Sequence, residues 1–391
     1  MLDSDSVAGQ GNPPAAVADD GVCAQGLASR IRALKQAGGA LPSWVYNDAG
    51  FLELEQERIF ASRWVCVGRV DTLREAGDYL VTAIAGEPVI VVRNSEDSIQ
   101  AFSNVCRHRM SLLLEGRGSV SRIVCPYHAW TYDLDGRLRG APLMEGNEGF
   151  RSDAICLPRV RCESWQGWLF LSLDETIPAP GETFAEVADL VNDWGMAHYV
   201  ESFREEMEWD GNWKQVAENF MESYHLPVCH SGTVGRAVNL RELATSELRD
   251  DFNYHCIVSD GSNPLTIAHA TNQRLRGEQR RTTWVLALYP SLMITLTPGY
   301  FWYLCIQPLG VSRSHVVFGG GMAPEYAADN RAEALFADTK AVTAAIIEED
   351  RLCVQRVCRG AQARLAEAGP LNQLEKGNQG FARWILERVG S

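Results

Sequence analysis

Two short Cys/His motifs carry the most specific chemistry in this chain of 391 residues. The first is Cys106-x-His108, and the second, after sixteen intervening residues, is Cys125-x-x-His128. Two thiolates and two imidazoles can hold a [2Fe–2S] cluster in which the cysteines bind one iron and the histidines bind the other. Because neutral imidazoles replace two thiolates, the reduction potential of such a cluster lies well above that of an all-cysteine cluster. The two motifs therefore predict an electron-transfer site.

A structural zinc site is the main alternative, since Zn²⁺ is also bound by two cysteines and two histidines. A zinc finger places both cysteines in one motif and both histidines in the other, whereas each motif here is mixed. Two irons with different ligands require the mixed order. The sequence therefore favours a Rieske cluster, with Cys106, His108, Cys125 and His128 as its ligands.

A second group of ligand-type side chains lies about a hundred residues further along. A helix that begins at Trp213 would place Glu222 and His225 on one face, because residues three and four apart stack. Pro227 would end this helix, so that His230 reaches the same ion from the turn beyond it. Two histidines and one carboxylate form the facial triad of non-haem Fe(II) oxygenases, which leaves coordination positions open for O₂.

The missing carboxylate is expected in a helical stretch far down the chain, at Asp350, with Glu349 as its nearest rival. Taken alone, the acidic run at 348–350 would be a solvated helix face. The two groups of ligands support each other, however, because a Rieske cluster needs a destination for its electrons and O₂ activation at one iron needs an electron source. We therefore expect His225, His230 and Asp350 to bind a mononuclear Fe(II).

The expected elements fall into two regions. Short strands at 99–104 and 121–124 lead into the two Cys/His motifs, and a strand at 130–133 leads out of the second. A Pro/Gly-rich boundary lies at 177–181. The elements expected beyond it are strands at 283–288, 300–307 and 314–319 and a long helix at 331–367.

Together these motifs resemble the α (oxygenase) subunit of the Rieske non-haem iron oxygenases, the aromatic ring-hydroxylating and demethylating family. The resemblance extends from Leu41 to Trp384, and its main segments are Asn104-Val105-Cys106-Arg107-His108-Arg109, Cys125-Pro126-Tyr127-His128-Ala129-Trp130, Asn212-Trp213-Lys214, Glu222-x-Tyr224-His225-x₄-His230, Asp350 and Phe381-x-x-Trp384. It implies an α+β protein, with an N-terminal all-β Rieske domain inserted in or followed by a helix-grip catalytic domain that has an antiparallel sheet over a long C-terminal helix. The expected parts are a disordered tail at 1–22, an N-terminal helical segment at 23–62 that packs on the catalytic domain, a Rieske [2Fe–2S] domain at 63–175 and a catalytic mononuclear-iron domain at 182–391.

The resemblance also implies partners and further site residues. Similar proteins form head-to-tail homotrimers and receive NAD(P)H electrons from a separate reductase, with or without a ferredoxin. Glu222 occupies the position that bridges His225 to a cluster histidine of the neighbouring chain, and Tyr224 and Asn219 are implied as catalytic residues. Many relatives have aspartate at the bridge and one more residue between the segments that correspond to Glu218-Asn219-Phe220 and Tyr224-His225. Glutamate at Glu222 resembles the branch that includes carnitine and glycine-betaine oxygenases.

Composition excludes several other classes of protein. The formal net charge of −14 disfavours binding to phosphate backbones, so nucleic acid is not an expected partner. No uncharged run approaches the ~18 residues of a membrane span, and the first twenty residues lack the apolar core of a signal peptide. Two of the eleven cysteines are the expected cluster ligands. The other nine are scattered singly, as expected of reduced thiols in a cytoplasmic protein.

The expected activity is hydroxylation or oxidative demethylation of a small organic substrate by a monooxygenase or dioxygenase. An aromatic or heteroaromatic acid is the first interpretation, because four arginines crowd one predicted loop: Arg274, Arg276, Arg280 and Arg281. The alternative is N-demethylation or cleavage of a quaternary ammonium compound, whose cation would pack on aromatic faces. An electron-transfer protein without catalysis and a zinc-stabilised interaction module are alternatives of other classes.

Overall fold

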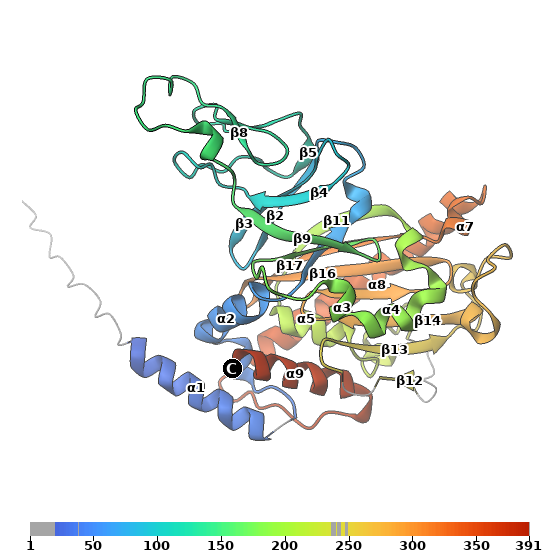
Figure 1. Ribbon diagram of the computed structural model, residues 1–391. Helices are drawn as coiled ribbons and strands as arrows, with labels where there is room; N and C mark the ends of the chain where they lie inside the picture. Colours follow the sequence, from blue (N-terminus) through green and yellow to red (C-terminus); the bar gives the residue numbers. More distant parts are fainter. Residues whose placement is uncertain (1–19, 38, 236–239, 241–243, 247–248, 391) are drawn as a thin grey trace, which may run out of the picture.

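The structure, a computed structural model, describes residues 20–37, 39–235, 240, 244–246 and 249–390. The expected tail at 1–22 lies outside these residues except for its last three positions, which begin a helix. Two antiparallel seven-stranded sheets, one small three-stranded sheet and helices around the second large sheet make up the described part (Figure 1). This arrangement confirms the predicted α+β class, with an all-β part followed by a sheet with a long helix.

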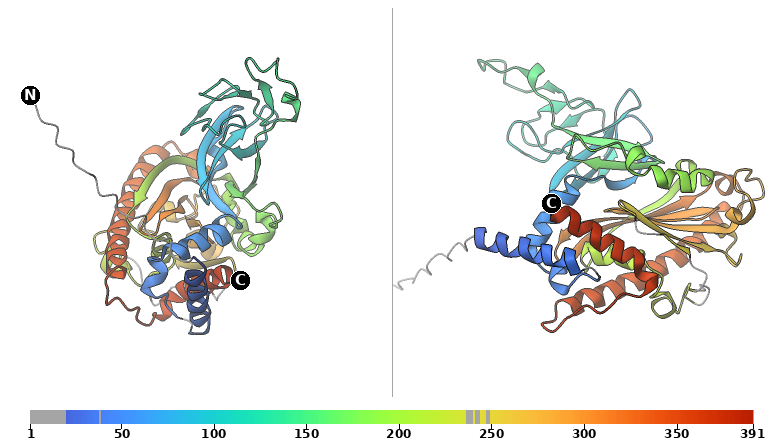
Figure 2. Two further views of the ribbon diagram at one scale, coloured as in Figure 1. Left: turned by 90° about the vertical axis from the view of Figure 1, so that its left-hand side faces the viewer. Right: turned by 60° about the horizontal axis from the view of Figure 1, so that its bottom comes forward.

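The first large sheet belongs to the N-terminal half of the chain. Its strands, in spatial order, are β1 (Val65–Arg69), β10 (Trp168–Ser172), β9 (Arg159–Trp165), β4 (Ile99–Ser103), β3 (Glu87–Arg93), β2 (Asp78–Ile84) and β5 (Arg117–Ser119). The β-branched run of β3 is buried on both faces, as continuous apolar strands usually are. The small sheet consists of β6 (Ile123–Val124), β7 (Thr131–Tyr132) and β8 (Leu138–Gly140), and it lies on the far side of the first sheet from the second large sheet (Figures 1 and 2).

The second large sheet forms the centre of the C-terminal half. Its strands, in spatial order, are β11 (Val200–Trp209), β17 (Arg313–Met322), β16 (Tyr300–Gly310), β15 (Leu292–Leu296), β14 (Thr282–Leu288), β13 (Phe252–Val258) and β12 (Ala244–Thr245). Alternate residues of β16 enter different cores: Leu304 and Ile306 pack with the helices α5, α8 and α9, while Tyr303 and Cys305 pack with β10 and α4. The sheet is therefore covered on both faces.

The helices that matter for the site lie on one face of this second sheet (Figure 2). The α-helices of the described residues are α1 (Asp20–Ala37), α2 (Ala49–Glu55), α3 (Pro180–Thr183), α4 (Ala185–Val191), α5 (Trp213–Phe220), α6 (Leu226–Cys229), α7 (Pro324–Ala327), α8 (Ala332–Ala361) and α9 (Lys376–Val389). Helix α8 is the long helix predicted at 331–367, although it ends earlier than predicted. None of the helices in the described residues has an apolar stretch long enough to cross a membrane.

Candidate functional site

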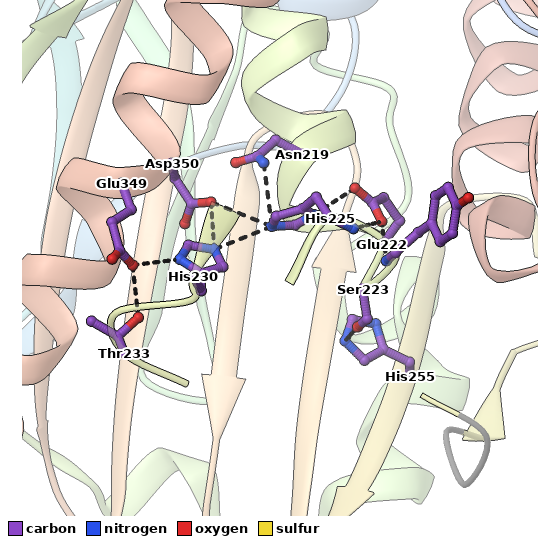
Figure 3. Close-up of polar contacts among 10 residues, drawn as sticks. Asn219, Glu222, Ser223, His225, His230, Thr233, His255, Glu349 and Asp350 are labelled. Atoms are coloured by element: carbon purple, nitrogen blue, oxygen red, sulfur yellow. Dashed lines mark hydrogen bonds and ion pairs between the residues drawn. The ribbon is translucent and has the colours of Figure 1, made fainter. Parts of the chain in front are cut away.

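His225, His230 and Asp350 meet between α6 and α8 (Figure 3). One possible ligand atom from each residue lies within 4.8 Å of the other two. The Nε2 atoms of the two histidines are 3.2 Å apart, and Asp350 Oδ1 lies 3.4 Å from His225 Nε2 and 3.0 Å from His230 Nε2. Residues more than a hundred positions apart thus place three donor atoms around one point, and they are the three residues expected from the sequence to bind a mononuclear iron.

The local chain path explains how the two histidines converge. The prediction of one helix from Trp213 to Pro227 is wrong, because α5 ends at Phe220 and a turn follows. In that turn a carboxylate oxygen of Glu222 accepts the backbone N–H groups of Tyr224 and His225, and such side-chain contacts compete with helix continuation. Pro227 lies in the first turn of α6, where its missing N–H costs nothing.

Each histidine also meets a carboxylate at its other ring nitrogen. His225 Nδ1 lies 2.5 Å from Glu222 Oε1, and His230 Nδ1 lies 2.8 Å from Glu349 Oε2. Hydrogen bonds of this kind fix the ring orientation and keep the proton on Nδ1, so that the Nε2 lone pair is directed at the common point.

The charges at the common point favour a cation. Burial works to lower the pKa of His225, but Asp350 and Glu222 outweigh it and raise this pKa to about 10. Burial likewise works to raise the pKa of Asp350, but the two imidazoles hold it below its ordinary value. Asp350 Oδ1 is nevertheless buried without a hydrogen-bond partner. A buried anionic oxygen that faces two imidazole nitrogens fits a divalent metal ion, and this donor set is that of non-haem iron.

A cavity of about 260 Å³ opens beside His225. Three glutamates line it, Glu218, Glu222 and Glu375, whereas no lysine or arginine is among the described residues that line it. Asn219, which the sequence predicted as catalytic, also lines the cavity, and its Nδ2 lies 3.4 Å from His225 Nε2. Tyr224 is 53% exposed beside this site.

The four predicted cluster ligands lie on two loops at the tip of the first half of the chain. Cys106 and Cys125 are buried, whereas His108 and His128 are exposed, with their ring centroids 4.7 Å apart. Each loop closes in the same way, because the N–H of Met110 donates to the Cys106 carbonyl and the N–H of Ala129 donates to the Cys125 carbonyl. Both closing residues have a positive φ of 57°.

The surroundings of the thiols fit a cluster with inner cysteines and outer histidines. Burial works to raise the pKa of Cys125, but the backbone N–H groups of Tyr127 and His128 point at its sulfur, and the net effect is a lowered pKa. The hydroxyl of the buried Tyr132 lies 3.3 Å from Cys106 Sγ. The ring of His108 stacks on that of Trp130, at 4.7 Å between centroids. Thiolates stabilised by N–H groups are suited to bind an iron–sulfur cluster.

Sequence reasoning missed several residues of these surroundings. It treated Glu349 only as a rival ligand, and it gave no role to Tyr132, which lies seven residues after Cys125. His255 is buried nearby, with its Nε2 3.0 Å from Ser223 Oγ. No periodicity marks such contacts, because they join side chains of different elements.

Comparison with known protein families agrees with this geometry. Residues 63–158 match the model of the Rieske [2Fe-2S] domain, and residues 196–391 match the model of the ring hydroxylating alpha subunit (catalytic domain). Between them the two matches cover both sets of candidate ligands.

Individual relatives come from bacteria. The carnitine monooxygenase oxygenase subunit of Escherichia coli is 34% identical over 50% of this chain and 54% of its own length. The glycine betaine monooxygenase oxygenase subunit of Chromohalobacter salexigens is 33% identical over 68% of this chain and 56% of its own length. The putrescine 2-hydroxylase of Ralstonia nicotianae is 30% identical over 88% of this chain and 94% of its own length. The chain thus spans about half the length of the first two relatives and nearly all of the third.

Solved structures have the same fold. The quaternary ammonium Rieske monooxygenase CntA in complex with L-carnitine has a TM-score of 0.74 at 22% identity, over 90% of this chain and 95% of that one. The naphthalene 1,2-dioxygenase from Rhodococcus sp. has a TM-score of 0.75 at 20% identity, over 90% and 94%.

The fold and the family matches define an iron-dependent oxygenase with an iron–sulfur domain. The chain belongs to the Rieske non-haem iron oxygenase family, in which it is an oxygenase (α) subunit. Its two domains bind two cofactors: the Rieske domain binds a [2Fe–2S] cluster, and the catalytic domain binds a mononuclear iron.

Proposed function

We propose that this chain is the terminal oxygenase of a monooxygenase system that oxidises a small organic cation, with a quaternary ammonium compound as the first candidate. The convergence of His225, His230 and Asp350 within 4.8 Å, in a chain that also has the two Cys/His loops, carries this proposal. A pure electron carrier would have no use for the second set of donors, so that alternative is disfavoured.

The first interpretation of the substrate, an aromatic acid, depended on four arginines that the structure uses elsewhere. Arg280 donates to the carbonyl oxygens of four residues of its own loop, and Arg274 pairs with Glu325 at 3.6 Å. The other two are exposed, and none of the four lines the cavity beside His225. Leu275, which follows Arg274 in the sequence, packs in the core on the face of the second sheet opposite to α5 and α8. None of these four guanidinium groups is therefore placed to bind a carboxylate there.

An organic cation agrees better with the lining of the cavity. Glu222 and Glu375 line this space, and the described residues place no basic side chain there, so a positively charged group would meet no opposing charge. The relatives named for carnitine and glycine betaine support a quaternary ammonium substrate, and the relative named for putrescine supports a diamine as the second candidate.

The proposed mechanism assigns each residue a task. Iron, when bound by His225, His230 and Asp350, supplies the site at which O₂ is activated. Glu222 holds His225 through Nδ1, and we propose that it also contacts a cluster histidine of a neighbouring chain, since His108 and His128 are exposed at the tip and available to a second subunit. A solved relative is described in terms of inter-subunit electron transfer, which supports this path. A separate reductase would supply the electrons.

Iron analysis combined with substrate-dependent NADH consumption tests the proposal. We expect about three irons per chain, two in the cluster and one mononuclear, and the spectrum of a reduced Rieske centre. The His225→Ala variant should keep the cluster and lose both the third iron and product formation. In a panel of quaternary ammonium compounds, diamines and aromatic acids, the first class should stimulate NADH consumption with matching product. A colourless protein, or full product yield from His225→Ala, would overturn the proposal.

A further inference from the structure

Glu349 lies on the opposite side of His230 from the proposed metal (Figure 3). Its Oε2 lies 2.8 Å from His230 Nδ1 and accepts the hydroxyl of Thr233 at 2.7 Å. The next residue in the same helix, Asp350, meets His230 at the other ring nitrogen, Nε2, at 3.0 Å. Two consecutive carboxylates of α8 therefore hold opposite edges of one imidazole, and only one of them faces the common point.

We propose that Glu349 is a positioning residue that prepares His230 to bind the metal, rather than a ligand in competition with Asp350. This inference depends on the metal site proposed above. A carboxylate at Nδ1 keeps the proton on that nitrogen, leaves the Nε2 lone pair free and makes the imidazole a stronger donor. Glu222 makes the corresponding contact with His225, so each histidine of the site has its own carboxylate.

The position of the Glu349 carboxylate is fixed from a second direction. The segment after His230 turns back on itself, because the N–H groups of Thr233 and Gly235 both donate to the His230 carbonyl. This turn brings Thr233 to the carboxylate, and a Cβ placed on Gly232 would lie 3.1 Å from Glu349 Oε1. The turn that carries the histidine thus contacts the Glu349 carboxylate at a second point, which orients the ring and joins the turn to α8.

The test measures metal affinity independently of turnover. Purified protein whose mononuclear iron has been removed by a mild chelator, with the cluster retained, is dialysed against Co²⁺ at a series of concentrations, and bound cobalt is measured by metal analysis. Glu349→Ala should raise the Kd for Co²⁺ about 10- to 100-fold. Glu349→Gln should raise it less, because the amide oxygen still accepts the Nδ1 proton. Thr233→Val, which removes the second contact without touching His230, should have a smaller effect in the same direction.

Two reference variants separate the possible outcomes. Glu348→Gln is the matched control, since Glu348 is the preceding carboxylate in the helix and pairs with Arg351; its Kd should equal that of wild type. Asp350→Ala should weaken binding more than any Glu349 variant. A wild-type Kd in both Glu349 variants would overturn the inference, and so would a loss in Glu349→Ala as complete as in Asp350→Ala, which would make Glu349 a ligand. Wild-type binding by Asp350→Ala would instead reject the metal site itself. If Glu349→Ala fails to fold, Glu349→Gln and Thr233→Val decide the question.

Discussion

Tyr132 is a buried side chain in direct contact with a proposed cluster ligand. Its hydroxyl accepts the N–H of Arg107 at 3.0 Å and lies 3.3 Å from Cys106 Sγ, to which it can donate. A hydrogen bond to a thiolate stabilises the reduced, more negative cluster. We therefore expect Tyr132→Phe to lower the reduction potential by on the order of 50 mV, which corresponds to roughly 1 kcal/mol for a one-electron couple.

A redox titration of the cluster measures this shift. Tyr127→Phe is the control, because Tyr127 is 54% exposed and its hydroxyl lies 3.4 Å from Arg109 rather than at a thiol. An equal shift in both variants would show that the hydrogen bond is not its cause.

The carboxylate of Glu222 contacts two sets of partners, and both contacts require the full length of the glutamate side chain. One carboxylate oxygen meets His225 Nδ1 at 2.5 Å, and the other accepts backbone N–H groups of the turn, including that of His225 at 3.2 Å. The shorter side chain of Glu222→Asp cannot reach both sets of partners. Turnover coupled to NADH should fall about tenfold or more, while reduction of the cluster by dithionite stays complete. If Glu222→Asp turns over as fast as wild type, reach is irrelevant at this position.

The types of the ligand residues were predictable from the sequence, but their outer contacts were not. Cysteine and histidine in two mixed motifs specify a cluster because few other sites use these four donors in this order. Whether Glu349 faces the metal or the far edge of His230 depends on the rotation of α8, which no spacing within α8 defines. Likewise, the contact between Tyr132 and Cys106 depends on how β7 packs beside the first loop.

Helix α5 begins with a capping box that also joins three segments. Asn212 Oδ1 accepts the N–H of Lys214, and Asn212 Nδ2 donates to the carbonyls of Tyr46 and Val311. Asn212 is only 1% exposed. Asn212→Ala should lower the free energy of unfolding by about 2 to 4 kcal/mol, since it removes the cap and leaves two carbonyls without this donor. Urea denaturation measures the change. The control is Asn372→Ala, a capping residue nearer the surface, which should cost about 1 kcal/mol.

Helix α5 also carries Glu218, whose carboxylate accepts the hydroxyl of Tyr46 at 2.8 Å. Burial raises the pKa of Glu218 to about 7. Because this value exceeds that of the unfolded chain, the folded state binds the proton more tightly, and the stabilisation is complete below about pH 4.5 and is lost as the pH rises through about 7. Glu218→Gln should remove this decline in the free energy of unfolding. Glu53→Gln, at an exposed position, is the control and should keep the same decline. An unchanged decline in Glu218→Gln would show that another group titrates.

The elements were predicted with unequal success, for physical reasons. Strands such as β14 and β17 and the long α8 have periodic or β-branched sequences, and their own residues determine them. The break after Phe220 was missed because a carboxylate contact, not a proline or glycine, ends α5. The domain limits expected at 63–175 and 182–391 remain a prediction.

Hydrophobic clusters join the two halves of the chain. Trp168 and Phe170 of β10 pack in the same cluster as Phe301 and Tyr303 of the second sheet, and the guanidinium of Arg69 lies over the rings of both Trp168 and Phe301. A hydrogen bond from Cys66 N to Ser291 Oγ joins the same two sheets. The first sheet is therefore fastened to the second along β1 and β10.

This attachment, together with the position of the Cys/His loops beyond the far side of the first sheet, prevents the tip from swinging down to the triad of its own chain (Figure 1). Complementation between two inactive proteins should follow. Cys106→Ser keeps a working triad and His225→Ala keeps a working cluster, so neither should form product alone. When the two are co-expressed, assemblies that contain both should regain turnover, because the proposed electron path between subunits joins the intact cluster of one chain to the intact triad of another.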